Sequence, residues 1–358
     1  MANSRKTASL MVGFGAAMAL VATTGYGWTH EAVAAAQPSC GSSFDPYSSD
    51  PSTLSACGII SYPLQSVATL ADGSHVYTYT VEGDTTTYTV PPAGFDMASA
   101  SPAQLAEYGV PPAPPTGTSA YSVWEASIQK MHILTPPSAL VSVPVRADGD
   151  SNIWAGWEGM SNSSTTYNTV ETYFKPEQLG SSRCSTNSVV FWSGLGGDGV
   201  SSLAQDGTGQ NTPGLGQDQT WTEVLPTQTS IVPQNLYGTY NQFIEFYAHH
   251  GGAHNDQFSF FMQNQYTGDS VNPVVTDSHY NGTTAEVIAE RPTVNGVPTN
   301  LSNFGTVNFD QSSLNGHFMN DGTYRIGPFY MYNNSTELAV PSGIDVNHHF
   351  VVTQLSCN

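Results

Sequence analysis

The chain has 358 residues, with eight Lys and Arg against 28 Asp and Glu, which gives a formal net charge of −20. A surface this acidic repels phosphate backbones and anionic lipid, so the charge argues against nucleic-acid and membrane-surface partners. Only 10% of the residues are charged, and neutral side chains supply most of the polarity. This composition suits an acidic medium, and it equally suits an ordinary acidic secreted protein.

Residues 1–36 have the pattern of a secretory signal peptide. The basic pair Arg5-Lys6 precedes a short apolar stretch over residues 10–21, and Ala34-Ala35-Ala36 offers a cleavage site. No other segment is apolar enough to span a bilayer. We therefore predict a secreted, extracellular protein without a membrane anchor, and we expect a monomer.

The four cysteines allow three disulfide pairings, and an even number in an exported chain predicts that all of them are paired. We expect Cys40–Cys57 to close a local loop and Cys184–Cys357 to tie the end of the chain to the large domain. Their spacing does not match a zinc ribbon.

Residues 37–147 form an N-terminal segment rich in Pro, Ser, Thr and Ala. Short alternating strands are expected at His75–Tyr79 and Thr86–Val90. A helix is expected around Pro102–Tyr108, because Ser101 can cap it and Pro102 suits its first position. The proline run of residues 110–115 must be extended, as a linker or a strap across another surface. The segment is either a propeptide or a permanent subdomain.

Residues 148–358 read as one all-β domain. Short β-type segments recur between Gly, Asn, Asp and Pro, and no helical period of any length occurs, which predicts an antiparallel sandwich or barrel. The expected strands include Thr169–Phe174, Ser188–Ser193, Gln242–Tyr247, Gln257–Phe261, Ala285–Glu290 and Gly305–Phe309.

Two of these strands carry carboxylates on one face. In Ala285–Glu290, small apolar residues suit a core, and Glu286 and Glu290 project from the opposite face. Glu245 and Tyr247 likewise share a face of their strand. If these strands neighbour the segments that hold Trp154, Trp192 and Gln205, one concave face carries all of these side chains. Any one of them alone would ordinarily belong to a solvated sheet face.

The order of these segments resembles the glutamic peptidases, the eqolisin family. The resemblance covers roughly residues 150–355 and is carried by Asn152/Trp154/Ala155/Gly156, Trp192/Gly194, Gln205/Gly207, Glu245/Tyr247 and Ala285/Glu286/Ile288/Glu290. It implies a two-sheet antiparallel sandwich of concanavalin A-like (jelly-roll) type, which acts on polypeptides without metal or cofactor.

The resemblance also implies roles for these residues. Gln205 and Glu290 align with the catalytic pair, in which Glu activates water and then acts as an acid, and Gln stabilises the oxyanion. Trp154 and Trp192 would flank the cleft. Substrate contacts are expected from Glu245, Tyr247 and Glu286.

The strand of Glu245 departs from the family pattern. The family commonly has an aromatic residue before this Glu and Tyr-Pro at the end of the strand, whereas here Ile244 precedes it and the chain continues into His249-His250. These histidines, with His254 and Asp256, could bind a metal, but a solvated loop is the interpretation we favour.

Two other functions stay open. A glycan-binding or glycan-hydrolysing sandwich would also combine Glu and Trp, and an inactive family relative would fit the departures. Glu286 and Glu290 lie about 13 Å apart along one strand, too far for a glycosidase pair. Glu245 and Glu290 could be nearer if their strands are adjacent. No Gly-x-Ser-x-Gly motif and no Asp-Thr-Gly or Asp-Ser-Gly pair occurs.

Overall fold

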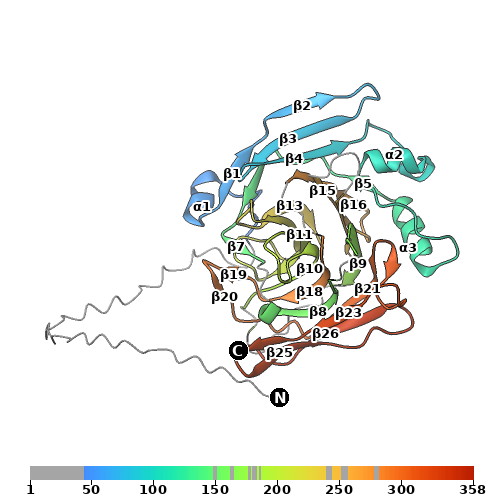
Figure 1. Ribbon diagram of the computed structural model, residues 1–358. Coiled ribbons are helices and arrows are strands. Elements are labelled where there is room, and N and C mark those ends of the chain that lie inside the picture. Colours follow the sequence, from blue (N-terminus) through green and yellow to red (C-terminus); the bar gives the residue numbers. More distant parts are fainter. Residues whose placement is uncertain are drawn as a thin grey trace, which may run out of the picture. The chain divides into compact units, whose positions relative to one another are not determined.

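The computed structural model describes residues 44–147, 151–161, 165–175, 179, 184, 187–238, 257–277 and 282–358, and the main chain alone of residues 244–250. Strands dominate this part of the chain, and most of them belong to two large sheets (Figure 1). The described strands pair antiparallel, except that β5 and β16 pair parallel. The predicted two-sheet β-sandwich is confirmed.

Seven of the described strands form what we call the front sheet. Its order is β13 (Val232–Tyr237), β12 (Gln219–Leu225), β11 (Leu203–Gln210), β10 (Val189–Gly196), β18 (Ala285–Glu290), β8 (Trp154–Gly159) and β23 (Ile326–Phe329).

The back sheet has 14 strands within the described residues. Its main path is β2 (Ser66–Thr69), β3 (His75–Val81), β4 (Asp84–Val90), β17 (Val274–Thr276), β15 (Gln257–Asn264), β14 (Ile244–His250), β9 (Thr169–Lys175), β21 (Thr306–Leu314), β26 (His349–Gln354), β25 (Thr336–Pro341) and β24 (Met331–Asn333). Off this path lie β16 (Asp269–Val271), β5 (His132–Ile133) and β22 (His317–Phe318).

Smaller elements complete the described fold. Two short sheets pair β1 (Ile60–Pro63) with β6 (Ala139–Ser142), and join β20 (Val297–Pro298), β19 (Thr293–Val294) and β7 (Val145–Arg146). The helices are α1 (Pro51–Ala56), α2 (Pro102–Glu107), α3 (Ser119–Ile128), η1 (Met97–Ser99) and η2 (Ser151–Ile153). The predicted helix is confirmed as α2, where Ser101 and Gln104 form a capping box.

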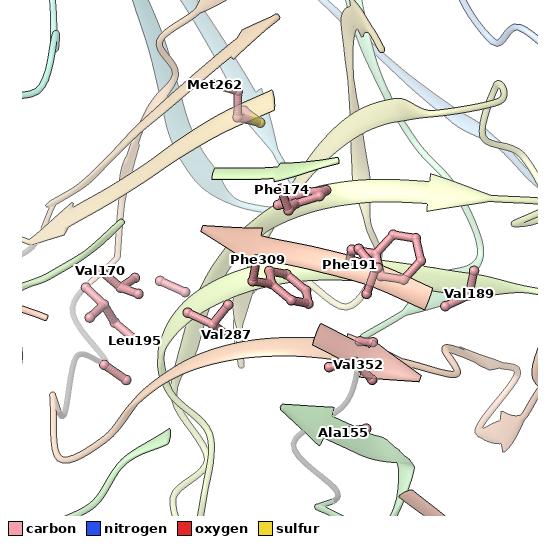
Figure 2. Close-up of a cluster of buried hydrophobic side chains, with 14 of the residues drawn as sticks. Ala155, Val170, Phe174, Val189, Phe191, Leu195, Met262, Val287, Phe309 and Val352 are labelled. Atoms are coloured by element: carbon pink, nitrogen blue, oxygen red, sulfur yellow. The ribbon is translucent and has the colours of Figure 1, made fainter. Parts of the chain in front are cut away.

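An apolar core lies between the two sheets, and strand alternation decides which residues enter it. From β10, Phe191 and Leu195 join Val287 of β18 and Phe309 of β21 in this core (Figure 2). Ala285, Val287 and Ala289 all belong to it, as the pattern of that strand predicts. The alternate residues of the same strands must therefore face the other side of the front sheet.

That other side, which we call the outer face, is covered by the N-terminal segment. Residues 139–147, here named the covering strand, place Val143, Val145 and Ala147 in a second apolar cluster with Trp192 and Trp221. Val143 N–H donates to the Ile231 carbonyl at 3.0 Å, and Ile231 N–H donates to the Val145 carbonyl at 2.9 Å. Burial on both faces explains why every residue of β10, β11, β12 and β18 is buried.

The N-terminal segment is also built into the back sheet. Its strand β4 pairs with β17 through Thr85, Thr86 and Thr87. Leu105 and Ile128, from α2 and α3, pack against Phe261 of β15. In this structure the segment therefore contacts both sheets of the sandwich.

The structure contains the expected disulfide between Cys184 and Cys357. Cys57 is also disulfide-bonded, and its expected partner Cys40 lies outside the described residues. Among the helices that the structure describes, none is both long and apolar enough to cross a membrane.

Candidate functional site

The outer face of the front sheet arranges its polar residues in rows. Residues directly opposite each other on antiparallel strands share a face. One row crosses β8, β18, β10, β11 and β12, and consists of Glu158, Glu286, Gly194, Gln205 and Glu223. The motifs around Gly194, Gln205 and Glu286, which are separate in the sequence, therefore lie side by side on the outer face.

Glu290 lies at the end of β18, in a parallel row opposite Trp154 of β8. Its Oε2 accepts hydrogen bonds from Trp154 Nε1 at 3.1 Å and Trp192 Nε1 at 2.6 Å. The two indole rings pack edge to face, with centroids 5.0 Å apart, and all three side chains are fully buried. Two neutral donors on packed rings thus hold this carboxyl group in one position.

A glycine on β11 makes room for Trp192 beside Trp221. Gly207 lies opposite both Trp192 and Trp221 in the row between the two carboxylate rows. A Cβ at Gly207 would lie 2.2 Å from the Phe191 carbonyl oxygen, 2.8 Å from Trp192 Cβ and 2.8 Å from Trp221 Cζ2. A larger residue would therefore displace the β10 main chain together with Trp192, whose indole holds Glu290.

Gln205 is fully buried on β11. Its Nε2 donates to the Ala147 carbonyl at 2.7 Å and to Glu223 Oε2 at 2.9 Å. The same Glu223 oxygen accepts the Ala147 N–H at 3.0 Å. The covering strand therefore presents a peptide carbonyl directly to the amide that we expected, from the family resemblance, to be the oxyanion donor.

Gln205 and Glu290 share this face without touching in any described contact. Their partners on the intervening strand β10 are Gly194 and Val190. At about 3.3 Å per residue and about 4.8 Å between strands, their Cα atoms lie roughly 16 Å apart. The row between them on the same face holds Trp192 of β10 and Ile288 of β18, and both side chains are fully buried.

A second acidic group lies at the other end of the row. Glu158 and Glu286 are directly opposite each other on β8 and β18. Burial raises the pKa of Glu158 to about 7, with a further contribution from the charge of Asp198. Burial also raises the pKa of Glu286 well above its usual value; the charges of Glu158 and Asp198 add to this, and the nearby Thr284 side chain opposes it. Both carboxyl groups are therefore neutral in acid.

The structure does not bring Glu245 and Tyr247 to this face. Both lie on β14, which belongs to the back sheet and pairs with β9 and β15. Because β14 is not adjacent to β18, the Glu245–Glu290 pair that kept a glycosidase mechanism open is not formed. The condition that the motif strands are neighbours is thus not met by this strand, and the expected substrate contacts from Glu245 and Tyr247 are not placed at this face.

Glu223 occupies the position that the sequence analysis gave to Glu245. It lies on β12, opposite Gln205, and the sequence analysis missed it. The available signal was the segment Trp221-Thr222-Glu223-Val224-Leu225-Pro226. This segment ends in the proline that the Glu245 strand lacks.

In the described part of the chain, no group of three or more His, Cys, Asp or Glu residues could hold a metal ion. Of the histidines considered above, His249 and His250 end β14, and His254 lies outside the described residues.

Comparison with solved structures gives several similar proteins. Scytalido-glutamic peptidase with a transition state analogue inhibitor shares 17% identity, covering 57% of this chain and 98% of that one, with a TM-score of 0.45. SCP-B, an eqolisin in complex with the tripeptide Ala-Ile-His, shares 15% identity over 57% of this chain and 98% of that one, with a TM-score of 0.43. Aspergilloglutamic peptidase from Aspergillus niger shares 18%, covering 47% and 99%, with a TM-score of 0.38.

A search of curated proteins gives no match. The model of the Peptidase A4 family, however, matches residues 152–345, which is more than half of the chain and includes the strands that carry Trp154, Gln205 and Glu290. The chain belongs to the Peptidase A4 family, the glutamic peptidases or eqolisins.

Proposed function

We propose that this protein is a secreted acid endopeptidase that hydrolyses peptide bonds with Gln205 and Glu290. The observation that carries the proposal is the 2.7 Å hydrogen bond from Gln205 Nε2 to the main-chain carbonyl of Ala147. An amide that already holds a peptide carbonyl is placed to stabilise the oxyanion formed when water attacks that carbonyl. An amide also keeps its N–H donors at every pH, so it works in acid.

Glu290 supplies the proton transfers. As water attacks the scissile carbon, the carboxylate takes a proton from it. The protonated Glu290 then gives a proton to the leaving amine as the carbon–nitrogen bond breaks. Trp154 and Trp192 hold Glu290 Oε2 through their indole N–H groups, so the base keeps a fixed position through both steps.

We further propose that residues 1–36 are the signal peptide, residues 37–147 a propeptide or strap that covers the site, and residues 148–358 the peptidase domain. In this proposal Ala147 occupies the position of a substrate residue. Its N–H and carbonyl are bound by Glu223 and Gln205, so a substrate enters only after the covering strand leaves.

Acid would loosen this cover. Two further carboxylates accept hydrogen bonds across the boundary: Glu82 Oε2 from the Thr229 hydroxyl at 2.8 Å and from its N–H, and Asp45 Oδ1 from the Tyr237 hydroxyl at 2.8 Å. A hydrogen bond to an ionised carboxylate is stronger than one to a neutral carboxyl group. We propose that the segment covers the site at neutral pH and releases it in acid. An active, acid-treated sample in which the covering strand still occupied the site would contradict this mechanism of release.

The test is digestion of a denatured protein from about pH 2 to 7 by wild type, Glu290→Gln, Gln205→Ala and the control Asp218→Asn. Asp218 is a buried carboxyl group outside the site, and burial raises its pKa to about 7, so Asn resembles its neutral form in acid. The proposal expects acid-only cleavage that both site variants lose and the control retains. Cleavage that survives Gln205→Ala and Glu290→Gln, or no cleavage by wild type once the N-terminal segment has left, would refute it.

A further inference from the structure

Glu223 contacts both the Gln205 amide and the main chain bound in the site, two groups that the proposed reaction must align. The residue is fully buried on β12. Its Oε2 accepts one hydrogen bond from Gln205 Nε2 at 2.9 Å and another from the Ala147 N–H at 3.0 Å. One carboxyl oxygen thus touches both the oxyanion donor and the peptide in the site.

The contact with Gln205 solves a problem of orientation. The two ends of a glutamine amide have nearly the same shape but opposite hydrogen-bonding character, and only the N–H₂ end can stabilise an oxyanion. Glu223 Oε2 already accepts the Ala147 N–H and therefore acts as an acceptor here, so Glu223 favours Nε2 facing both itself and the Ala147 carbonyl. The reversed amide would place Oε1 against two acceptors. In the structure Gln205 Oε1 points away and has no hydrogen-bond partner among the described residues.

The contact with Ala147 adds a second function. The N–H and carbonyl of one residue in an extended chain point to the same side, as in a hydrogen-bonded pair of an antiparallel sheet. Glu223 binds the N–H of Ala147, and Gln205 binds its carbonyl. Every residue except proline offers both groups, so this pair can bind a substrate whatever its side chain.

We propose that Glu223 is a positioning residue for Gln205 and accepts the main-chain N–H of the substrate residue whose carbonyl is cleaved. The proposal rests on the proposed peptidase function. It predicts that a substrate residue without an N–H is disfavoured immediately before the cleaved bond, so proline should be poorly accepted there.

The first experiment compares Glu223→Gln with wild type and Asp218→Asn on one peptide in acid. Glutamine keeps the shape of Glu223 but can present a donor as readily as an acceptor, so the amide of Gln205 loses its preferred orientation. We expect kcat to fall about 10- to 100-fold, less than the loss of a whole oxyanion donor. Thermal unfolding should stay close to wild type. An unchanged kcat in a folded variant would overturn the proposal.

The second experiment changes the substrate, so its wild-type arm is informative even if Glu223→Gln does not fold. The peptide is compared with an analogue in which an ester oxygen replaces the N–H of the residue before the cleaved bond. Wild type should lose at least about tenfold in kcat/KM on the ester. Glu223→Gln should lose clearly less, because a double-mutant cycle reports direct contact as non-additivity. Equal losses in both proteins, or none in wild type, would refute the contact. Failure of wild type to cleave either peptide would instead refute the peptidase function itself.

Discussion

The two faces of the front sheet come from the same strands and are both buried, yet they differ in one respect: the outer face combines its buried tryptophans with a row of Glu and Gln side chains. On β18, Val287 enters the core between the sheets, whereas Glu286 and Glu290 point to the outer face. The inner face is covered by the second sheet of the sandwich. The outer face is covered by residues 139–147, which bind it partly through polar contacts. Alternation along one strand thus separates the residues that stabilise the fold from those that can act on a substrate.

The largest effect that tests this division is expected from Glu290→Gln on the outer face. Removing the general base should lower kcat by about 10³- to 10⁴-fold, because an amide cannot take the proton from water. The shape and the indole contacts can persist, so the free energy of unfolding should change little. Peptide hydrolysis and urea unfolding of the same preparations measure the two quantities, with Asp218→Asn as the active control. If the variant lost its activity because it was largely unfolded, Glu290 would stabilise the fold like the residues of the inner face. That result would contradict the division between the two faces.

Phe191→Ala on the inner face should do the reverse. Phe191 is fully buried between the sheets and packs against Phe174 and Phe304, with ring centroids 6.2 and 5.4 Å apart. Truncating such a ring costs about 3–5 kcal/mol of unfolding free energy. The fraction that remains folded should keep near-normal kcat. Urea unfolding measures the loss of stability, and active-site titration measures how much of the folded protein is active. A folded fraction that had lost its activity would contradict the prediction.

The inner face was the more predictable of the two from sequence. Alternation in Ala285–Glu290 gave both the bounds of β18 and its buried face, because a two-residue period has a direct geometric meaning. The start of α2 followed from Ser101 and Pro102 for a similarly local reason. Gln205 and Glu290 were identified as candidates by the order of motifs, and the structure brings both to one face.

The outer face could not be completed from sequence because strand pairing is a long-range property. Glu245 and Glu223 both follow the pattern of a carboxylate inside a β-type segment, and only pairing separates β14 from β12. The covering strand gave no signal of its own either. Val143, Val145 and Ala147 alternate like any half-buried strand, and nothing local states that they pack on Trp192.

The acidic pair on the outer face should make stability depend on pH. Glu158 has a pKa of about 7 when folded, against 4.5 for an ordinary Glu. Between these values the unfolded chain releases the proton and the folded chain keeps it. The stabilisation is therefore complete below about pH 4.5 and is lost as pH rises through 7, by up to about 3 kcal/mol. Glu158→Gln, which is neutral throughout, should flatten this dependence in urea unfolding between pH 4 and 7.5; an unchanged slope would mean that other groups cause it.

The smallest expected effect concerns the cover of the outer face rather than the face itself. Glu82→Gln keeps an acceptor for Thr229 but removes the charge, as protonation in acid would. Losing the charge assistance should weaken the hold of the N-terminal segment by about 0.5–1 kcal/mol, which corresponds to a roughly two- to fivefold rise in the activity of the full chain at pH 6. At pH 3, where the proposed mechanism releases the cover in both proteins, variant and wild type should be equal. A rise of the same size at both pH values would mean that the substitution acts on the catalytic groups, because the cover is released by acid in both proteins.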